Sequence, residues 1–157
     1  MSSCGIRYNM GRGVPSRFAI PKGVVMSALA GCKVVLIDDE PGVLKALTLL
    51  LQTMGCAVMA FGGPTEALAY LRAGIECDLI LSDQRMPGLI GSELFKLLRA
   101  HSVNAPFVLM SGHAGESEVE DVLRAPNTAF LTKPFSPVSL QSAAVAAIGR
   151  PPRARAV

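Results

Sequence analysis

A doubly wound α/β fold with a five-stranded parallel sheet is the fold class that the sequence predicts, and three observations support it. Five short apolar segments alternate along the chain with five segments of helical periodicity. Most of the apolar segments are continuous runs, which is typical of strands in a sheet that helices cover on both faces. Polar residues follow four of these runs where a strand would end, and right-handed crossovers bring such ends to one edge of the sheet.

In the first half of the chain, proline and glycine delimit the predicted helices. Pro41 and Pro64 stand at helix starts, where a missing backbone N–H is tolerated. Gly55 and Gly74 follow the last apolar residues of helical spacing and are expected to end these helices. The predicted order is strand 33–37, helix 41–54, strand 57–61 and helix 64–74.

The second half repeats this alternation and closes with a capped helix. Ser136 is the expected cap of the last helix, with Pro137 at its first position. The predicted order continues with strand 79–82, helix 92–101, strand 106–110, helix 116–125, strand 129–132 and helix 137–148. The apolar residues expected to face inward on the third and fourth helices are Leu94, Leu97, Leu98, Val119, Val122 and Leu123.

Composition and charge bound the class of protein. The 157 residues are 50% hydrophobic and 17% charged, as in one globular domain. Residues 32–149 are the expected domain and carry 12 acidic and 8 basic side chains. Residues 1–31 and 150–157 carry only basic charges, and we expect a flexible extension and a basic tail. Direct DNA binding is not expected, because the domain is acidic and no helix-turn-helix pattern follows its last helix.

The sequence also argues against a membrane protein and indicates a compartment. No apolar run approaches the ~20 residues that span a bilayer. The four cysteines show neither a C-x-x-C spacing nor a disulfide framework, which fits a cytoplasmic location.

Side chains that can react or bind a ligand follow the predicted strands: Asp38 and Asp39, then Asp83, Ser111 and Lys133. Carboxylates brought together repel one another, and Mg²⁺ relieves that repulsion while leaving positions for phosphate oxygens. Lys133 adds a positive charge and Ser111 a hydroxyl donor for further phosphate oxygens. The set predicts phosphoryl transfer in which Asp83 attacks phosphorus. Each residue alone would be read as a cap, a turn or a solvated charge, so the prediction rests on their joint occurrence.

Four motifs at the strand ends permit a comparison with a known family. They are Val34-Val35-Leu36-Ile37-Asp38-Asp39-Glu40, Ser82-Asp83-Gln84-Arg85-Met86-Pro87-Gly88, Leu109-Met110-Ser111-Gly112-His113 and Phe130-Leu131-Thr132-Lys133-Pro134-Phe135. With these motifs in order, residues 32–149 resemble a receiver domain of the bacterial two-component response regulators, the CheY-like superfamily. The resemblance implies a flavodoxin-like sheet in the order 2-1-3-4-5 with five helices.

The same resemblance implies roles for individual residues. Asp83 would accept a phosphoryl group from a histidine kinase or a phosphotransfer protein. The Mg²⁺ ion would be held by Asp39 and Asp83 directly, by Asp38 through water and by the backbone carbonyl of Arg85. The implied catalytic residues are Asp83, Lys133 and Ser111, and the implied switch pair is Ser111 and Phe130. A cis bond between Lys133 and Pro134 is implied as well.

The expected function is that of a single-domain receiver, whose fourth helix, fifth strand and fifth helix change their surface for an unidentified downstream protein. It is not expected to be an enzyme with a separate substrate, since it would catalyse only its own phosphorylation and dephosphorylation. A homodimer is left open. Two other functions remain as alternatives: a Mg²⁺-dependent phosphatase of another α/β family, and a scaffold that works without phosphorylation. Such phosphatases often carry a second aspartate two residues after the nucleophile, where this chain has Arg85.

Overall fold

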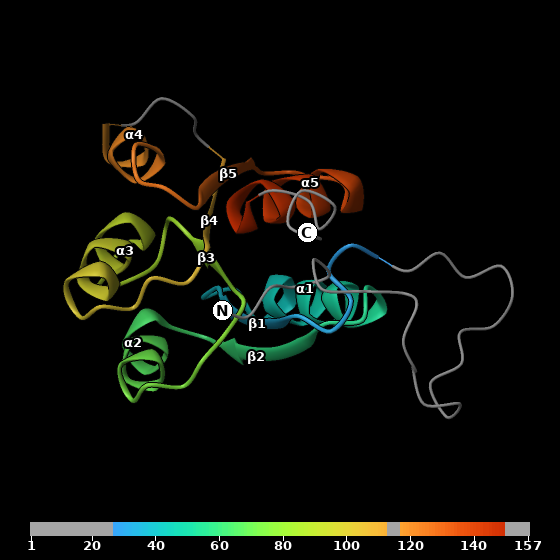
Figure 1. The fold of residues 1–157 in the computed structure, drawn as a ribbon, viewed down its shortest axis with the longest axis horizontal. Helices are drawn as coiled ribbons and strands as arrows, with labels where there is room; N and C mark the ends of the chain where they lie inside the picture. Colours follow the sequence, from blue (N-terminus) through green and yellow to red (C-terminus); the bar gives the residue numbers. More distant parts are fainter. Residues whose placement is uncertain (1–26, 113–116, 150–157) are drawn as a thin grey trace, which may run out of the picture.

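A parallel sheet with the strand order β2-β1-β3-β4-β5 forms the centre of the computed structural model, which confirms the predicted fold class (Figure 1). The structure describes residues 27–112 and 117–149, so most of the predicted extension and all of the tail lie outside it. The strands are β1 (Lys33–Ile37), β2 (Ala57–Phe61), β3 (Leu79–Asp83), β4 (Phe107–Ser111) and β5 (Thr128–Thr132). The helices are α1 (Pro41–Thr53), α2 (Pro64–Arg72), α3 (Gly91–Ala100), α4 (Ser117–Leu123) and α5 (Pro137–Ile148).

Helices cover both faces of the sheet: α1 and α5 lie on one side, and α2, α3 and α4 lie on the other (Figure 1). Alternate residues of a strand therefore enter different cores. In β1, Val34 and Leu36 pack with the α1 and α5 side chains, whereas Val35 and Ile37 pack with those of α2, α3 and α4. Strands β3 and β4 are buried along their whole length, which explains why their sequences are continuous apolar runs.

The helix boundaries follow the predicted proline and cap signals. Proline occupies the first turn of α1, α2 and α5, and the Ser136 side chain accepts a hydrogen bond of 3.1 Å from the backbone N–H of Ser139. Helix α2 ends two residues earlier than predicted, and Gly74 follows with φ 85°, a left-handed conformation that favours glycine. Among the described residues, no helix is long and apolar enough to cross a membrane.

Two residues that the sequence placed in the core are exposed. Leu97 is 38% exposed and Leu123 is 43% exposed. On α3 the buried stripe is centred on Leu94, Phe95 and Leu98, so that Leu97 lies at its outer edge. Phe95, which the pattern of leucines left out, is 5% exposed and stacks edge-on against Phe107, with ring centroids 5.1 Å apart. Leu123 is the last residue of the short helix α4, beyond the two valines that cover the sheet.

A turn at residues 27–32 seals the core at the amino-terminal edge of the sheet. Leu29 and Cys32 are fully buried among side chains of α1 and α5. The Ser27 hydroxyl donates to the Gln141 side chain of α5 at 2.9 Å, and the Gly31 backbone N–H donates to the Gly55 carbonyl at 2.8 Å. The turn therefore links the end of α1 to the middle of α5.

Two thiols near this edge have raised pKa values. Burial, followed by the negative charge of Asp78, raises the pKa of Cys56 and of Cys77 from 9.0 to about 11. Cys56 and Cys77 are both free thiols.

The raised pKa values predict slow alkylation. At pH 8 we expect iodoacetamide to modify Cys56 and Cys77 roughly 100-fold more slowly in the folded chain than in the denatured chain, because a pKa two units higher leaves that much less thiolate. Asp78→Asn should speed both reactions, since it removes the nearby negative charge. Peptide mapping by mass spectrometry measures each site. Equal rates in native and denatured protein would contradict the prediction.

Candidate active site

The carboxyl-terminal edge of the sheet gathers the acidic residues that the sequence singled out. Asp38 and Asp39 directly follow β1, and Asp83 is the last residue of β3. These strands are neighbours, and one ligand oxygen from each carboxylate lies within 4.8 Å of the others. The predicted grouping of Asp38, Asp39 and Asp83 is therefore present in the structure.

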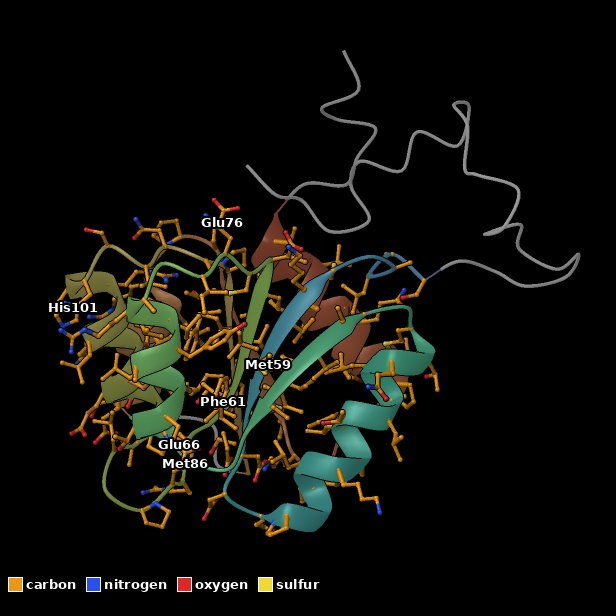
Figure 2. All side chains as sticks on the ribbon, turned by 90° about the horizontal axis from the view of Figure 1, so that it is seen from below. Met59, Phe61, Glu66, Glu76, Met86 and His101 are labelled. Atoms are coloured by element: carbon orange, nitrogen blue, oxygen red, sulfur yellow. The ribbon has the colours of Figure 1, made fainter. Side chains whose placement is uncertain are left out.

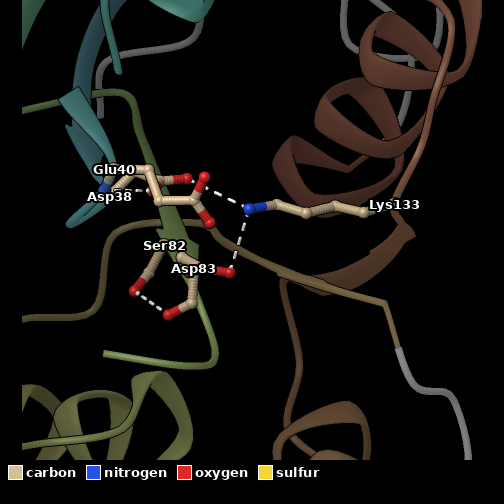
Figure 3. Close-up of polar contacts among 5 residues, drawn as sticks. All are labelled: Asp38, Glu40, Ser82, Asp83 and Lys133. Carbon is tan, nitrogen blue, oxygen red and sulfur yellow. Dashed lines mark hydrogen bonds and ion pairs between the residues drawn. The ribbon is translucent and has the colours of Figure 1, made fainter. Parts of the chain in front are cut away.

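Lys133 bridges two of these carboxylates. Its Nζ atom lies 3.1 Å from Asp38 Oδ2 and 3.1 Å from Asp83 Oδ1 (Figure 3). Asp38 and Asp83 are buried, whereas the Lys133 side chain is 23% exposed and reaches the acids from the turn after β5. The peptide bond between Lys133 and Pro134 is cis, as the family resemblance implied.

The charges of this cluster shift the pKa values of its members. Burial raises the pKa of the Asp83 carboxyl, and the charges of Asp38 and Asp39 add to this, while the hydrogen bond and charge of Lys133 act in the opposite direction. Burial lowers the pKa of Lys133, but its contacts with Asp38 and Asp83 outweigh burial and raise it overall. Lys133 is therefore a fixed positive charge at neutral pH beside a carboxylate that burial disfavours.

Local hydrogen bonds hold the first acid in place. Asp38 Oδ1 accepts a hydrogen bond of 3.0 Å from the Glu40 backbone N–H, and its other oxygen contacts Lys133 (Figure 3). The backbone N–H of Asp38 donates to the Phe61 carbonyl at the end of β2 at 3.2 Å. Both the side chain and the backbone of Asp38 are thus fixed before any ligand arrives.

The loop between β3 and α3 has polar contacts that sequence reasoning did not find. The Ser82 hydroxyl donates to the Asp83 carbonyl at 3.0 Å (Figure 3). Gln84 is fully buried, and its side chain exchanges two hydrogen bonds with Ser92 at the start of α3. A glutamine beside a loop gives no sequence signal for such pairing, because the partner is eight residues away and both types are ordinary surface residues.

Ser111 and Phe130 belong to the next two strands of the sheet, β4 and β5. Ser111 ends β4 and is buried, and its carbonyl accepts a hydrogen bond of 2.9 Å from the Lys133 backbone N–H. Phe130 of β5 is half-buried, pairs in register with Leu109 and packs on the side of α2, α3 and α4. Arg85 is exposed in the loop after Asp83. His113, also near this edge in sequence, lies outside the described residues.

The donor set fits a divalent cation. Carboxylate oxygens are the ligands that Mg²⁺ prefers, and two ligands bound at ~2.1 Å can lie up to about 4.2 Å apart. The upper separation of 4.8 Å among Asp38, Asp39 and Asp83 therefore needs only a small adjustment, or one intervening water. The cluster can hold a magnesium ion.

Comparison with known proteins points to one family. Residues 34–145 match the family model described as the response regulator receiver domain. The transcriptional regulatory protein FixJ of Azorhizobium caulinodans is 35% identical over 116 residues, which cover 73% of this chain and 54% of that protein. The matching segments cover 26% and 23% of the next two relatives, so this chain spans about half or less of the length of these three curated relatives.

Solved structures show the same fold. The chemotaxis protein CheY4 of Vibrio cholerae has a TM-score of 0.65 at 28% identity, over 72% of this chain and 95% of that chain. The receiver domain of the sensor histidine kinase PA1611 from Pseudomonas aeruginosa PAO1 has a TM-score of 0.66 at 27% identity, over 77% of this chain and 100% of that chain. The latter structure has a magnesium ion coordinated in its active site cleft.

Proposed function

The chain belongs to the response regulator receiver domain family, and we propose that it accepts a phosphoryl group on Asp83 in a Mg²⁺-dependent reaction. The donor is a histidine kinase or a phosphotransfer protein. The observation that carries the proposal is the position of Asp83, which ends the central strand β3 beside two further carboxylates with the Lys133 ammonium on one of its oxygens.

In the proposed reaction, a carboxylate oxygen of Asp83 attacks the phosphorus atom of phosphohistidine. The new P–O bond forms as the P–N bond breaks, and the histidine nitrogen leaves with the electron pair and takes up a proton. The product is an acyl phosphate on Asp83. Hydrolysis by water regenerates the carboxylate and releases inorganic phosphate, so the chain has no separate substrate.

Charge compensation in this reaction is assigned to a bound Mg²⁺ ion and to Lys133. Asp39 and Asp83 would hold Mg²⁺ directly, and Asp38 would hold it through water, together with the backbone carbonyl of Arg85. The bound ion supplies charge neutralisation for the phosphoryl oxygens. Lys133 is already 3.1 Å from an Asp83 oxygen and keeps its proton. Its ammonium group is the counter-ion for the negative charge that the phosphoryl group adds.

The output is assigned to Ser111 and Phe130. A new charge of about −2 at Asp83 attracts the Ser111 hydroxyl, and the space it leaves is taken by the Phe130 ring. That repacking changes the surface that α4, β5 and α5 present to a downstream protein. Such a protein distinguishes the phosphorylated from the unphosphorylated chain only if it binds the two packings with different affinities. The half-buried position of Phe130 supports this role, because a partly exposed ring can become more buried when it turns inward.

We also propose the limits and the location of this unit. The receiver domain comprises residues 32–149 together with the turn at residues 27–31, whose Leu29 is buried in its core. Residues 1–26 and 150–157 are the basic segments assigned outside it. The cytoplasm is the expected compartment, because phosphoryl groups derived from ATP are available there.

The test is phosphorylation by a small donor. Incubation with acetyl phosphate and Mg²⁺ should add one phosphoryl group per chain, and chelation of Mg²⁺ by EDTA should reduce the rate of that addition at least about tenfold. Intact-protein mass spectrometry measures both. The absence of any mass gain, or a gain indifferent to EDTA, would contradict the proposal. Steady turnover of a phosphate ester would favour the phosphatase alternative, and partner binding unaffected by beryllium fluoride would favour the scaffold.

A further inference from the structure

The loop that follows Asp83 is fastened to α3 by a buried glutamine. Gln84 is fully buried, and its Oε1 accepts a hydrogen bond of 2.8 Å from the Ser92 backbone N–H. Its Nε2 donates to the Ser92 hydroxyl at 3.0 Å. Ser92 is the second residue of α3, so its N–H is one of the first four of a helix, which have no partner within the helix. The amide of Gln84 thus caps α3.

The backbone of Gln84 is held from both sides as well. Its N–H donates to the Met110 carbonyl of β4 at 2.8 Å, and its carbonyl accepts from the Gly91 N–H at 3.0 Å. Two residues on, Met86 is 5% exposed and packs into the core on the side of α2 and α3. Figure 2 shows Met86 at the carboxyl-terminal end of the sheet, beyond Phe61 of β2.

Arg85 therefore lies between two buried anchors while being exposed itself. Arg85, and with it the backbone carbonyl, directly follows Gln84 and directly precedes Met86 in the chain. The buried anchors on either side limit the backbone conformations open to Arg85, and with them the directions in which its carbonyl can point. Residues that orient a metal ligand in this way affect metal affinity although they do not touch the metal.

We propose that Gln84 is a positioning residue for the Mg²⁺ site: its buried amide, paired with Ser92, fixes the backbone carbonyl of Arg85 where the ion takes it as a ligand. The inference rests on the proposed function, which supplies the role of that carbonyl. It adds a residue whose side chain touches neither the ion nor the phosphoryl group.

The test compares Gln84→Met with Thr128→Val. Gln84→Met keeps the length of the side chain and removes both hydrogen bonds to Ser92. Thr128→Val is the matched control, because Thr128 Oγ1 also contacts two partners, the carbonyls of Val122 and Ala125 at 3.1 and 2.9 Å. Thr128 begins β5, at the opposite edge of the sheet from the acidic cluster. Isothermal titration with MgCl₂ and thermal unfolding are measured for wild type and both variants.

We expect Gln84→Met to weaken the Kd for Mg²⁺ about tenfold and Thr128→Val to leave it within about twofold, although both lower the Tm. The rate of phosphorylation by acetyl phosphate should fall at limiting Mg²⁺ in Gln84→Met and recover at saturating Mg²⁺. Should Gln84→Met not fold, Ser92→Ala, which removes only the hydroxyl partner, should show a smaller loss in the same direction.

Two outcomes would overturn the inference: an unchanged Kd in the folded Gln84 or Ser92 variant, or an equal loss in Thr128→Val. Both are read against a wild type that binds Mg²⁺ and takes up phosphate. A wild type that does neither would instead contradict the proposed function, so the two failures are distinguishable.

Discussion

Asp83→Asn should lower the rate of phosphoryl uptake from acetyl phosphate by at least about three orders of magnitude, because the amide lacks the nucleophilic carboxylate oxygen. The variant should nevertheless fold, since the amide has the size of the carboxyl and its oxygen can still accept a hydrogen bond from Lys133. Mass spectrometry after incubation with acetyl phosphate and Mg²⁺ measures the loss.

The same substitution should raise stability in metal-free buffer at neutral pH. The folded state raises the pKa of Asp83 above its ordinary value of 3.8, chiefly through burial. A group of this kind favours folding below its unfolded pKa, and that contribution is lost as the pH rises through the folded pKa. Asparagine does not titrate, so the advantage of the variant over wild type should grow from pH 4 to pH 7 in urea unfolding. Mg²⁺ should stabilise wild type more than the variant.

The control for this prediction is Asp121→Asn. Asp121 is an exposed aspartate of α4 that pairs with Lys96 and Arg124, at 3.6 and 3.5 Å, away from the acidic cluster. Its amide variant should take up phosphate like wild type and should not become more stable in EDTA. Phosphorylated Asp83→Asn, or a stability gap that shrinks as the pH rises, would contradict the assignment of Asp83.

Gly91→Ala should destabilise the fold by about 1–3 kcal/mol, as overpacking of a core does. A Cβ atom at this position would press against the Asp83 backbone carbonyl and would lie 2.7 Å from Leu109 Cδ1. The Leu109 side chain can turn away, but the carbonyl belongs to a buried strand. The collision would push the end of β3 out of place, so phosphoryl uptake should fall together with stability.

Gly42→Ala is the matched control, since Gly42 also lies in the first turn of a helix and nothing stands within 4 Å of its added Cβ. Alanine there should leave stability unchanged or raise it by up to about 1 kcal/mol, because glycine loses more backbone freedom in a helix. Urea unfolding of both variants measures the difference. Equal midpoints for Gly91→Ala and Gly42→Ala would show that the close approach at Asp83 is not structurally demanding.

Much of the fold and the acidic cluster could be predicted because the informative signals are local. Apolar runs mark buried strands, prolines mark helix starts, and parallel topology alone brings Asp38 and Asp83 to one edge. The exposure of Leu97 could not be predicted, since helical spacing gives an apolar stripe but not which edge of it a neighbouring element covers. The pairing of Gln84 with Ser92 was beyond reach for a related reason: it depends on how the loop folds back onto α3, and neither residue type marks a buried position.

The buried turn at residues 27–32 bears on how the chain can be trimmed. The family match starts at residue 34, so a shortened version of the protein could be designed to begin there. Such a start would delete Leu29 and Cys32, two fully buried side chains, and would leave the ends of α1 and α5 facing solvent with unfilled apolar surface. A start at or before Ser27 keeps the buried side chains of this turn and the hydrogen bond between Ser27 and Gln141.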